Sequence, residues 1–491
     1  MVSARPHEQD RFWQLLLLVL VALTLYRAWV LVHNALPLFF DEAQYWAWSR
    51  TPDWGYYSKP PMVAWLIALT TLASDSELAI RIGTLLLHPL TALLVYATGR
   101  RIFGAGVALA AALLFISLPL VGFNSLFMTT DAPLFFFWGL AVFSFWRALE
   151  GNAWRHWLLA GVALGMGLLS KYSMLIFVPS AGLALCLPAY RAHWRNPRLY
   201  VAGLLALLIF LPNLWWNAQM DFVSFRHTAE ISQLERTLFH PARLFEFIGA
   251  QFLCMGPVAF ALLLAALAAP ATWRDRHTGF LAALTLPFLA VIALQALLAK
   301  ANANWAAPAY FGGALLVAAR WSLHTRRRRL LALVAIGLNL LFLSGFYHYR
   351  ELAAAAAIPL TRSTDPYARL RGWPQIGEAV RRTLAQHPDA QLAVLTRDEF
   401  ALLSYYARPE SARMRIWNPA QSRSNHFHLV ADAGKAPGAT YLFASRKELD
   451  DVPAASFASW RALGQASVPL YPGQALTVYL YLGQHFKGYQ R

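Results

Sequence analysis

The chain has 491 residues, of which 58% are hydrophobic and only 14% are charged. Soluble proteins carry about 25% charged residues, so this composition excludes an ordinary soluble enzyme. The formal net charge of +17 does not indicate a nucleic-acid-binding protein, because the basic residues mostly lie between long apolar runs and not on one soluble face. Cys186 and Cys254 both lie inside apolar runs, which excludes a disulfide framework and a CxxC metal or redox motif.

Apolar runs of membrane-spanning length recur through the first 349 residues. A hydrocarbon core about 30 Å thick is crossed by about 20 residues of helix, and about eleven runs reach or approach this length. The first run is too long for a signal peptide and lacks a small-residue cleavage site, so we expect a retained anchor. The predicted spans are 13–32, 79–98, 107–123, 133–149, 157–169, 173–187, 200–215, 244–268, 280–298, 305–319 and 330–346.

The distribution of charge predicts the orientation of these spans. With a cytoplasmic N-terminus, the inner segments hold 16 basic and four acidic residues, and the outer segments hold nine basic and ten acidic residues. This assignment treats 157–187 as two short spans joined at Ser170, Lys171 and Tyr172. A single helix there would leave Lys171 at the bilayer centre, at a cost of about 3 kcal/mol. The sequence therefore predicts that the C-terminal part lies outside the cytoplasm.

After Tyr349 the long apolar runs end, and segments of soluble character follow. The remaining residues, about 140, suffice for one small α/β domain. Spacing and composition predict helices at 376–384 and 398–407 and strands at 391–396, 440–444 and 475–481. We therefore expect a polytopic α-helical membrane domain at 1–349 and a small extracytoplasmic α/β domain at 350–491.

The first outer loop carries two adjacent carboxylates, Asp41 and Glu42, directly after Phe39 and Phe40. Desolvation at the end of a membrane span raises the pKa of a carboxyl group toward the range of a general base. The alternative interpretation is structural, because acidic residues favour the first turn of a helix that runs on through Trp48. The residues alone leave both interpretations open.

Lys59 lies in the same loop, within the run Tyr56-Tyr57-Ser58-Lys59-Pro60-Pro61. The apolar stretch 62–73 that follows is too short to span a membrane and is expected to form an interfacial helix. A lysine at the start of such a helix is suited to a phosphate at the end of a lipid, and the two tyrosines can add hydrogen bonds. The alternative is an aromatic belt with a snorkelling lysine, which needs no ligand.

Two further charged residues lie where outer segments meet the bilayer. Asp131 precedes an apolar helix, so it is either a site residue or, like Thr130, a candidate helix cap. Lys171 lies at the tip of a short hairpin, where it has little room to avoid the headgroup zone. Asn304 lies in an outer turn with amides and aromatic residues, which hydrogen-bond and stack on sugars; ordinary turn chemistry is the alternative.

The long outer segment from 217 to 243 contains Arg226, His227 and Glu230. His227 and Glu230 have the spacing of neighbours on a helix and could contribute to a metal site. No third ligand has diagnostic spacing, so the metal interpretation is weak, and no cofactor is predicted with a defined ligand set. Arg226 and His227 are instead assigned to the substrate-binding set.

Taken together, these residues resemble the polytopic GT-C glycosyltransferases of the protein mannosyltransferase type, glycosyltransferase family 39. This family includes the bacterial aminoarabinose transferases that modify lipid A. The matching features are Asp41-Glu42, the run from Tyr56 to Pro61, Thr130-Asp131-Ala132-Pro133, the Ser170-Lys171-Tyr172 hairpin, and Asn304-Trp305 with Pro308. The resemblance covers roughly residues 11–349, and the acidic pair together with the Lys-Pro-Pro element is its most specific part.

The resemblance implies transfer of a sugar from a polyprenyl phosphate to an acceptor on the outer side of the membrane, usually with inversion. It implies that Asp41 is the catalytic carboxylate and that Lys59 binds the phosphate. The aminoarabinose transferases have an acidic residue before this lysine, whereas this chain has Ser58. That departure weakens any transfer of their metal site or their donor sugar to this chain.

The expected function is therefore a glycosyltransferase of the bacterial inner membrane with a periplasmic active site. In this hypothesis Asp41 is the base, with Glu42 and Asp131 as further catalytic residues. Lys59 stabilises the leaving phosphate with help from Lys171 or Arg226. The acceptor could be lipid A, another lipopolysaccharide or glycan, or a protein. The alternatives are a transporter or flippase of lipid-linked saccharides, or a sensor whose C-terminal domain binds a partner.

Overall fold

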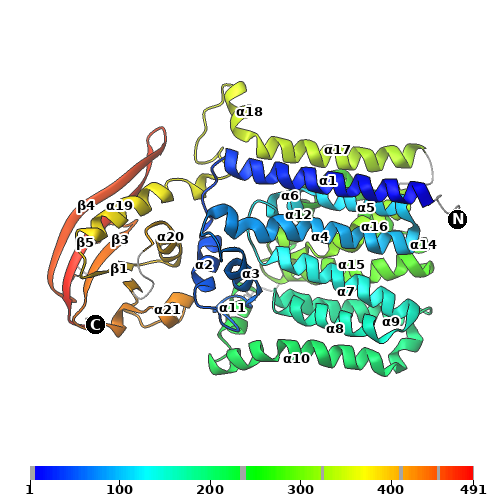
Figure 1. The fold of residues 1–491 in the computed structure, drawn as a ribbon, viewed down its shortest axis with the longest axis horizontal. Helices are drawn as coiled ribbons and strands as arrows, with labels where there is room; N and C mark the ends of the chain where they lie inside the picture. Colours follow the sequence, from blue (N-terminus) through cyan, green and yellow to red (C-terminus); the bar gives the residue numbers. More distant parts are fainter. Residues whose placement is uncertain (1–5, 233–238, 322–325, 409–412, 450–453, 490–491) are drawn as a thin grey trace.

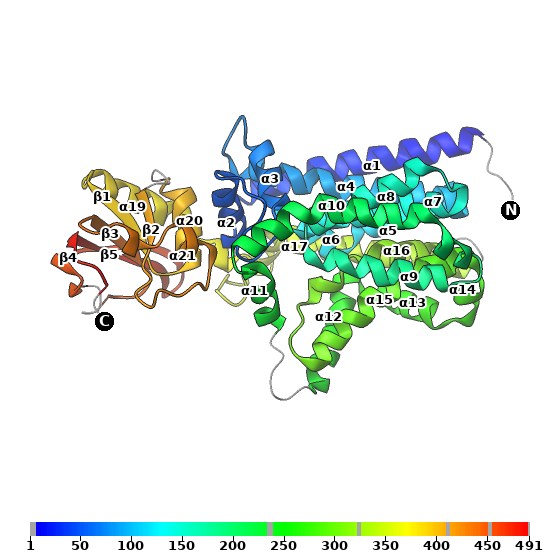
Figure 2. The same cartoon turned by 90° about the horizontal axis from the view of Figure 1, so that it is seen from below.

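The computed structural model describes residues 6–232, 239–321, 326–408, 413–449 and 454–489. A bundle of roughly aligned helices forms most of the molecule, and a sheet domain lies at one end of it (Figures 1 and 2). Six of the described helices are long and apolar enough to cross a membrane. These helices are α1 (Pro6–His33), α4 (Glu77–Phe103), α7 (Asp131–Gly151), α10 (Pro197–Gln219), α15 (Arg276–Leu298) and α17 (Arg326–Tyr347). The protein is thus a multi-pass membrane protein.

The remaining apolar runs of the bundle form shorter or broken helices. They are α5 (Ala105–Ser117), α6 (Pro119–Asn124), α8 (Trp154–Leu168), α9 (Phe177–Cys186), α12 (Pro241–Met255), α13 (Pro257–Ala268) and α16 (Ala309–Trp321). The prediction of one continuous span at 244–268 is wrong, because the chain bends by 114° between α12 and α13. Counting that bent pair as one span gives seven spans among the described residues, so the predicted number of eleven is not confirmed.

The break between α12 and α13 has a local cause at Gly256, whose φ of +90° is accessible mainly to glycine. A Cβ atom there would lie 1.8 Å from Oδ1 of Asn339, so no larger residue fits. The amide of Asn339 on α17 donates to the Met255 carbonyl at 3.2 Å, which satisfies a backbone group freed at the end of α12. Gly256, the proline that follows it and the amide of Asn339 therefore produce a sharp bend in place of one straight helix.

The outer surface of the bundle is apolar and uncovered. Leu18 and Leu25 on α1, Leu204 on α10 and Leu341 on α17 are each more than half exposed. In water such a surface would cost free energy, whereas hydrocarbon covers it without penalty. This pattern matches a membrane-embedded bundle, whose polar residues instead face inward or lie at its ends.

Three short helices lie between the bundle and the sheet domain (Figure 1). They are α2 (Phe40–Ser49), α3 (Met62–Thr70) and α11 (Val223–Ser232). The run 62–73 was expected to form an interfacial helix, and α3 occupies this place at the end of the bundle. The three helices belong to the loops at this end of the bundle, which carry most of the candidate site residues.

The sheet domain has five strands in the order β2-β1-β3-β5-β4. Strands β1, β2 and β3 pair in parallel, and β5 joins β3 and β4 antiparallel. The strands are β1 (Ala390–Val394), β2 (Met414–Ile416), β3 (Thr440–Ser445), β4 (Phe457–Tyr471) and β5 (Gln474–Phe486), with helices α19 (Trp373–Ala385), α20 (Arg397–Tyr406) and α21 (His426–Val430). The prediction of a small α/β fold is confirmed, but β4 was missed because its alanines, serines and Gly464 lack a strand-like alternation.

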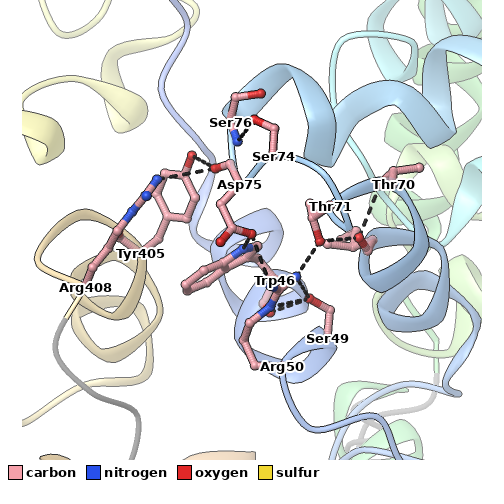
Figure 3. A network of polar contacts seen from close by, with 11 residues as sticks. Trp46, Ser49, Arg50, Thr70, Thr71, Ser74, Asp75, Ser76, Tyr405 and Arg408 are labelled. Atoms are coloured by element: carbon pink, nitrogen blue, oxygen red, sulfur yellow. Dashed lines mark hydrogen bonds and ion pairs between the residues drawn. The ribbon is translucent and has the colours of Figure 1, made fainter.

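Helix α20 fastens the sheet domain to the membrane part (Figure 3). Asp75 accepts a hydrogen bond from the indole of Trp46 at 3.1 Å and forms an ion pair with Arg50 at 3.1 Å. The Tyr405 hydroxyl donates to the Asp75 carbonyl at 2.7 Å, and the ring of Tyr405 packs edge-on against Trp46. One apolar cluster also continues from α2 and α3 into α20 and the sheet. The orientation of α20 is therefore set by the loops that carry the candidate site.

Candidate active site

Glu42, on α2, is closed off from solvent by an ion pair with Arg81 on α4. Nε and Nη2 of Arg81 lie 2.8 Å from the two carboxylate oxygens, and the Met128 amide donates at 2.9 Å. The amide of Phe39 donates to the same carboxylate at 3.0 Å, as in a capping box. Glu42 is only 1% exposed. This geometry suits a residue that holds α2 in place, and the role of Glu42 in catalysis stays a prediction.

Asp41, one residue earlier, is directed differently and keeps an accessible carboxylate. Its side chain is 34% exposed, and within the described residues it makes no hydrogen bond. Its ion-pair partner is Arg397, whose Nη2 lies 3.6 Å from Oδ1. Burial raises the pKa of Asp41 above its usual range, and the opposing charges of Arg397 and Lys59 only partly offset that rise. A carboxylate with these properties can accept a proton from a hydroxyl group.

Lys59 lies close to Asp41 at the end of a tight turn. The Tyr56 amide donates to the Lys59 carbonyl at 3.1 Å, and Pro60 and Pro61 lead directly into α3. Burial lowers the pKa of Lys59, the charge of Lys171 lowers it further, and Asp41 is the first of the groups that oppose this shift. Across the described chain its ammonium group has no hydrogen-bond or ion-pair partner. Lys59 therefore presents an unsatisfied positive charge beside Asp41.

Asp131, Lys171 and Asn304 come together from three separate segments. Nζ of Lys171 lies 2.6 Å from Oδ1 of Asp131, and the Asn304 amide donates to Oδ2 at 2.7 Å. Asp131 begins α7, Lys171 precedes the short helix Tyr172–Ile176, and Asn304 lies in the short helix Ala303–Ala306. The alternative of a helix cap is not supported, because Thr130 makes no capping hydrogen bond and the Asp131 carboxylate faces Lys171 and Asn304.

The two tyrosines of the loop differ in their surroundings. Tyr56 stacks on Trp48 with ring centroids 4.4 Å apart, and its hydroxyl donates to the Trp48 carbonyl at 3.1 Å. These contacts hold Tyr56 within the fold. The ring of Tyr57 instead contacts the imidazole of His227 at 4.8 Å between centroids. Burial, followed by the charge of Lys59, lowers the pKa of His227, so its imidazole is neutral near pH 7.

Arg226 is not brought to the cluster. Its side chain is exposed, and its guanidinium donates to the carbonyl of Asp221. His227 and Glu230 form a long contact of 3.9 Å. No group of three or more histidine, cysteine, aspartate or glutamate side chains in the described ranges could hold a metal ion. In the described part of this segment, His227 contacts Tyr57, and the Ser224 hydroxyl donates to the Tyr56 carbonyl at 2.7 Å.

Two residues near Asp41 were not anticipated from the sequence. Tyr45 lies one helical turn after Asp41 and is buried beside it, a position that the i, i+4 spacing on α2 could have indicated. Arg397 comes from α20, more than 350 residues further along the chain. No local signal marks it, although the Thr396–Glu399 capping box defines the start of its helix.

A cavity of about 650 Å³ lies between α2 and the sheet domain. Trp46, Ala47 and Trp48 contribute from α2, and Phe400 and His426 contribute from the sheet domain. At 100° per residue Trp46 and Ala47 point away from the face of α2 that carries Asp41, whereas Trp48 lies on that face. Burial lowers the pKa of His426 to about 4, so the histidine in the wall is neutral. The lining also includes Tyr56 of the predicted set, whereas Asp41 and Lys59 are not among the lining residues.

The fold and this cluster define a multi-pass membrane protein with carboxylates and cations gathered at one end of its bundle. The sequence profile of the dolichyl-phosphate-mannose-protein mannosyltransferase family matches residues 58–216, which include Lys59, Asp131 and Lys171. Residues 58–216 are thus similar to this family, and the expected resemblance is confirmed.

Curated relatives extend the similarity. The chain is 38% identical to the lipid A galacturonosyltransferase RgtD of Rhizobium johnstonii over 63% of its own length and 66% of that protein. It is 33% identical to the undecaprenyl phosphate-alpha-4-amino-4-deoxy-L-arabinose arabinosyl transferase of Pseudomonas aeruginosa over 32% of this chain and 30% of that protein. The aligned parts thus span from about a third to just under two thirds of these relatives.

The fold is similar to that of ArnT from Cupriavidus metallidurans, solved bound to undecaprenyl phosphate. The TM-score is 0.69 at 16% sequence identity, and the match covers 95% of this chain and 97% of that chain. At this identity the likeness concerns the fold alone. It includes both the helical bundle and the C-terminal sheet domain.

Proposed function

We propose that this protein is an integral-membrane glycosyltransferase that moves a sugar from a polyprenyl-phosphate carrier to an acceptor hydroxyl group. The observation that carries the proposal is an accessible carboxylate, Asp41, and the ammonium of Lys59, which has no ion-pair partner among the described residues, near enough for each charge to shift the pKa of the other at the end of a membrane bundle. The names of the relatives support it, since they describe transfer of galacturonosyl and aminoarabinosyl groups. We propose lipid A or another lipopolysaccharide saccharide as the acceptor, with other glycans and proteins as less favoured candidates.

In the proposed reaction, Asp41 accepts the proton of the acceptor hydroxyl as its oxygen attacks the anomeric carbon of the donor. The bond between that carbon and the phosphate oxygen breaks, and the electron pair leaves with the polyprenyl phosphate. Lys59 stabilises the charge that develops on this phosphate. Attack opposite the leaving group inverts the configuration at the anomeric carbon. The carboxylate thus acts on the attacking hydroxyl group, and the cation acts on the leaving phosphate of the same displacement reaction.

The Asp131–Lys171 pair and Asn304 are proposed to shape the floor of this site. Their polar groups bind one another, so they hold the shape of the site and are not expected to bind a ligand directly. Tyr57 and His227 are proposed to contact the donor on the opposite side of Lys59. Arg226 is the least supported member of the predicted set, because its guanidinium donates to a backbone carbonyl away from these residues.

We further propose that the cluster and the domain formed by residues 350–491 face the periplasm of a bacterial inner membrane. The excess of basic residues in the opposite segments supports this orientation. A polyprenyl-phosphate donor also suits this compartment, because such a sugar is already activated and needs no cytoplasmic nucleotide. The location of the acidic and basic residues at the bundle end, and not midway along several spans, favours an enzyme over a transporter.

The decisive experiment gives the purified protein, in lipid nanodiscs, an undecaprenyl-phosphate hexose or hexuronic acid together with lipid A. Mass spectrometry of the acceptor should show the mass of one added sugar. Asp41→Asn should lower the rate by a factor of about 100 or more, because a general base contributes about that much. Glu150→Gln is the matched control, since Glu150 lies at the opposite end of α7 and pairs with Arg101 on the surface. Wild-type activity in Asp41→Asn would refute the proposed base.

A further inference from the structure

Arg397 brings a charge of the sheet domain into the Asp41 cluster. Its guanidinium carbon lies 4.9 Å from the ring centroid of Phe40, and its Nη2 lies 3.6 Å from Asp41. The other end of α20 is held by Tyr405 and Tyr406, whose hydroxyls donate to the Asp75 carbonyl and to Glu77. Because α20 is fastened at its far end, Arg397 is placed at the cluster by the docking of the whole helix.

These contacts leave the guanidinium N–H groups of Arg397 without a hydrogen-bond acceptor in the described structure. Its side chain is 36% exposed, and among the described residues no hydrogen bond is made to it. The distance to Asp41 exceeds that of a hydrogen bond, and the Phe40 contact engages a ring face and no N–H group. By contrast, Arg81 and Lys171 are closed by carboxylates at 2.8 and 2.6 Å. The cluster thus retains Lys59 without an ion-pair partner among the described residues and Arg397 with only the 3.6 Å ion pair to Asp41.

The carboxylates of the cluster, unlike Lys59 and Arg397, are mostly bound by partners within the protein. Glu42 is occupied by Arg81, and Asp131 is occupied by Lys171 and Asn304. Asp41 is the remaining acidic group near Lys59 in the described structure, and the proposed reaction requires it as the base. With Lys59 assigned to the phosphate and Asp41 to the base, the guanidinium N–H groups of Arg397 are donors that no hydrogen bond engages among the described residues. Such donors suit a carboxylate on the sugar and would repel the ammonium group of an amino sugar.

We propose that Arg397 is a specificity-determining residue that binds a carboxylate on the transferred sugar, so that the donor is a polyprenyl-phosphate uronic acid. This inference rests on the proposed function and names the substrate class of the same site. The planar fork of a guanidinium matches a carboxylate with two parallel hydrogen bonds, while a compact ammonium such as Lys59 suits a phosphate.

The geometry of a pyranose supports this division of roles. In a uronic acid, the carbon that bears the carboxylate and the anomeric carbon both adjoin the ring oxygen. A sugar whose anomeric carbon lies near Asp41 and whose phosphate contacts Lys59 thus directs its carboxylate to the neighbourhood of the anomeric centre. The Arg397 guanidinium lies 3.6 Å from Asp41 and can bind this group without displacing a hydrogen bond among the described residues.

The test compares two synthetic donors, undecaprenyl-phosphate galacturonic acid and undecaprenyl-phosphate galactose, which differ only at the sixth carbon. For each donor, kcat/KM is measured with the full-length protein in nanodiscs and lipid A as acceptor. The wild type should prefer the uronic acid, and Arg397→Gln should lower the preference ratio at least tenfold. Arg397→Lys should keep part of the preference, because it retains the charge but loses the fork. The ratio also cancels any effect of Arg397 on Asp41 that both donors share.

Arg381→Gln is the matched control, because Arg381 pairs with Glu378 on the surface of α19, and it should keep the wild-type ratio. An unchanged ratio in Arg397→Gln would overturn the inference. An equal loss with both donors would indicate that Arg397 acts on the phosphate or the acceptor, which also overturns it. Transfer from neither donor by the wild type would instead refute the proposed function. Thermal unfolding of each variant shows whether a lost ratio comes from a folded protein.

Discussion

The ammonium group of Lys171 lies 2.6 Å from a carboxylate oxygen of Asp131, although 40 residues separate the two in the chain. The pair is largely buried, with 16% of the Lys171 side chain and 5% of the Asp131 side chain exposed. Its closure ties the start of α7 to the turn after α8. Removal of one partner would leave the other charge without compensation in a region of low dielectric constant.

We therefore expect Lys171→Met to lower the free energy of unfolding by about 3–5 kcal/mol, the cost of an orphaned buried charge. The double variant Lys171→Met with Asp131→Asn should recover part of this loss, because the uncompensated carboxylate is gone. Thermal unfolding in detergent measures both. Additive losses in the double variant would contradict the assignment of a coupled pair.

The ion pair between Glu42 and Arg81 predicts that Glu42 contributes to the stability of the fold and not to the chemical step. Glu42→Gln should destabilise the protein, because it leaves Arg81 buried without its counter-charge. If Glu42 acts only by holding α2, a folded variant should keep its maximal kcat/KM, and the acidic limb should move to lower pH, because burial and the charge of Glu42 both raise the pKa of Asp41 and the variant removes that charge. The measurement is kcat/KM against pH beside a thermal unfolding curve. A large loss of maximal kcat/KM in a fully folded Glu42→Gln variant would show direct participation.

The pKa of Asp41 predicts how activity and stability depend on pH. Activity should fall as pH decreases through the raised pKa of Asp41, because the base must be ionised. Arg397→Gln removes an opposing charge, so this acidic limb should move to higher pH. The pH profile of kcat/KM measures the shift, and a limb that stays in place or moves to lower pH would contradict the contact.

Stability should have the opposite trend for the same group. The folded state holds the proton of Asp41 more tightly than the unfolded state does, so folding is favoured below the ordinary carboxyl pKa. That contribution is lost as pH rises through the raised pKa. Asp41→Asn should consequently unfold at a higher temperature than the wild type at neutral pH, while being inactive. A lower unfolding temperature would show that the ionised Asp41 is well stabilised in the fold.

Lys59 predicts an effect on donor use with little effect on folding. Its ammonium is unpaired and its burial is unfavourable, so Lys59→Met should leave the unfolding temperature unchanged or slightly raised. We expect kcat/KM for the lipid-linked donor to fall by about 100-fold, as for loss of a group that stabilises developing charge. Lys447→Met, at an exposed position in the sheet domain, is the control. Equal donor kinetics in both variants would refute the phosphate role.

The predicted orientation can be tested with reporter fusions. Alkaline phosphatase fused after Tyr349 should be active, because this enzyme folds outside the cytoplasm. The same reporter fused after Glu150, between α7 and α8, should be inactive, since the adjoining segment holds Arg147 and Arg155. A cytoplasmic signal after Tyr349 would overturn the orientation and, with it, the periplasmic active site.

Several features of this protein were accessible from the sequence because they depend on local composition. Apolar runs mark the bundle helices since the bilayer imposes one length scale on every span. The α19 and β1 segments follow from short-range periodicity, and both were predicted. The corner at Gly256 was missed because hydropathy continues across it, while backbone strain and the Asn339 contact decide the bend.

Part of the candidate site could likewise be predicted from the sequence, and part could not. Asp41, Lys59, Asp131 and Lys171 could be selected from the sequence, since a charged residue at the end of an apolar span is costly and needs a reason. Only the tertiary structure decided which of these side chains form an ion pair and which stay available to a ligand. The ion pairs of Asp131 with Lys171 and of Glu42 with Arg81 depend on how helices pack, and no local pattern encodes such packing. Arg397 reaches Asp41 because α20 docks on α2, a contact between distant segments that the sequence does not reveal.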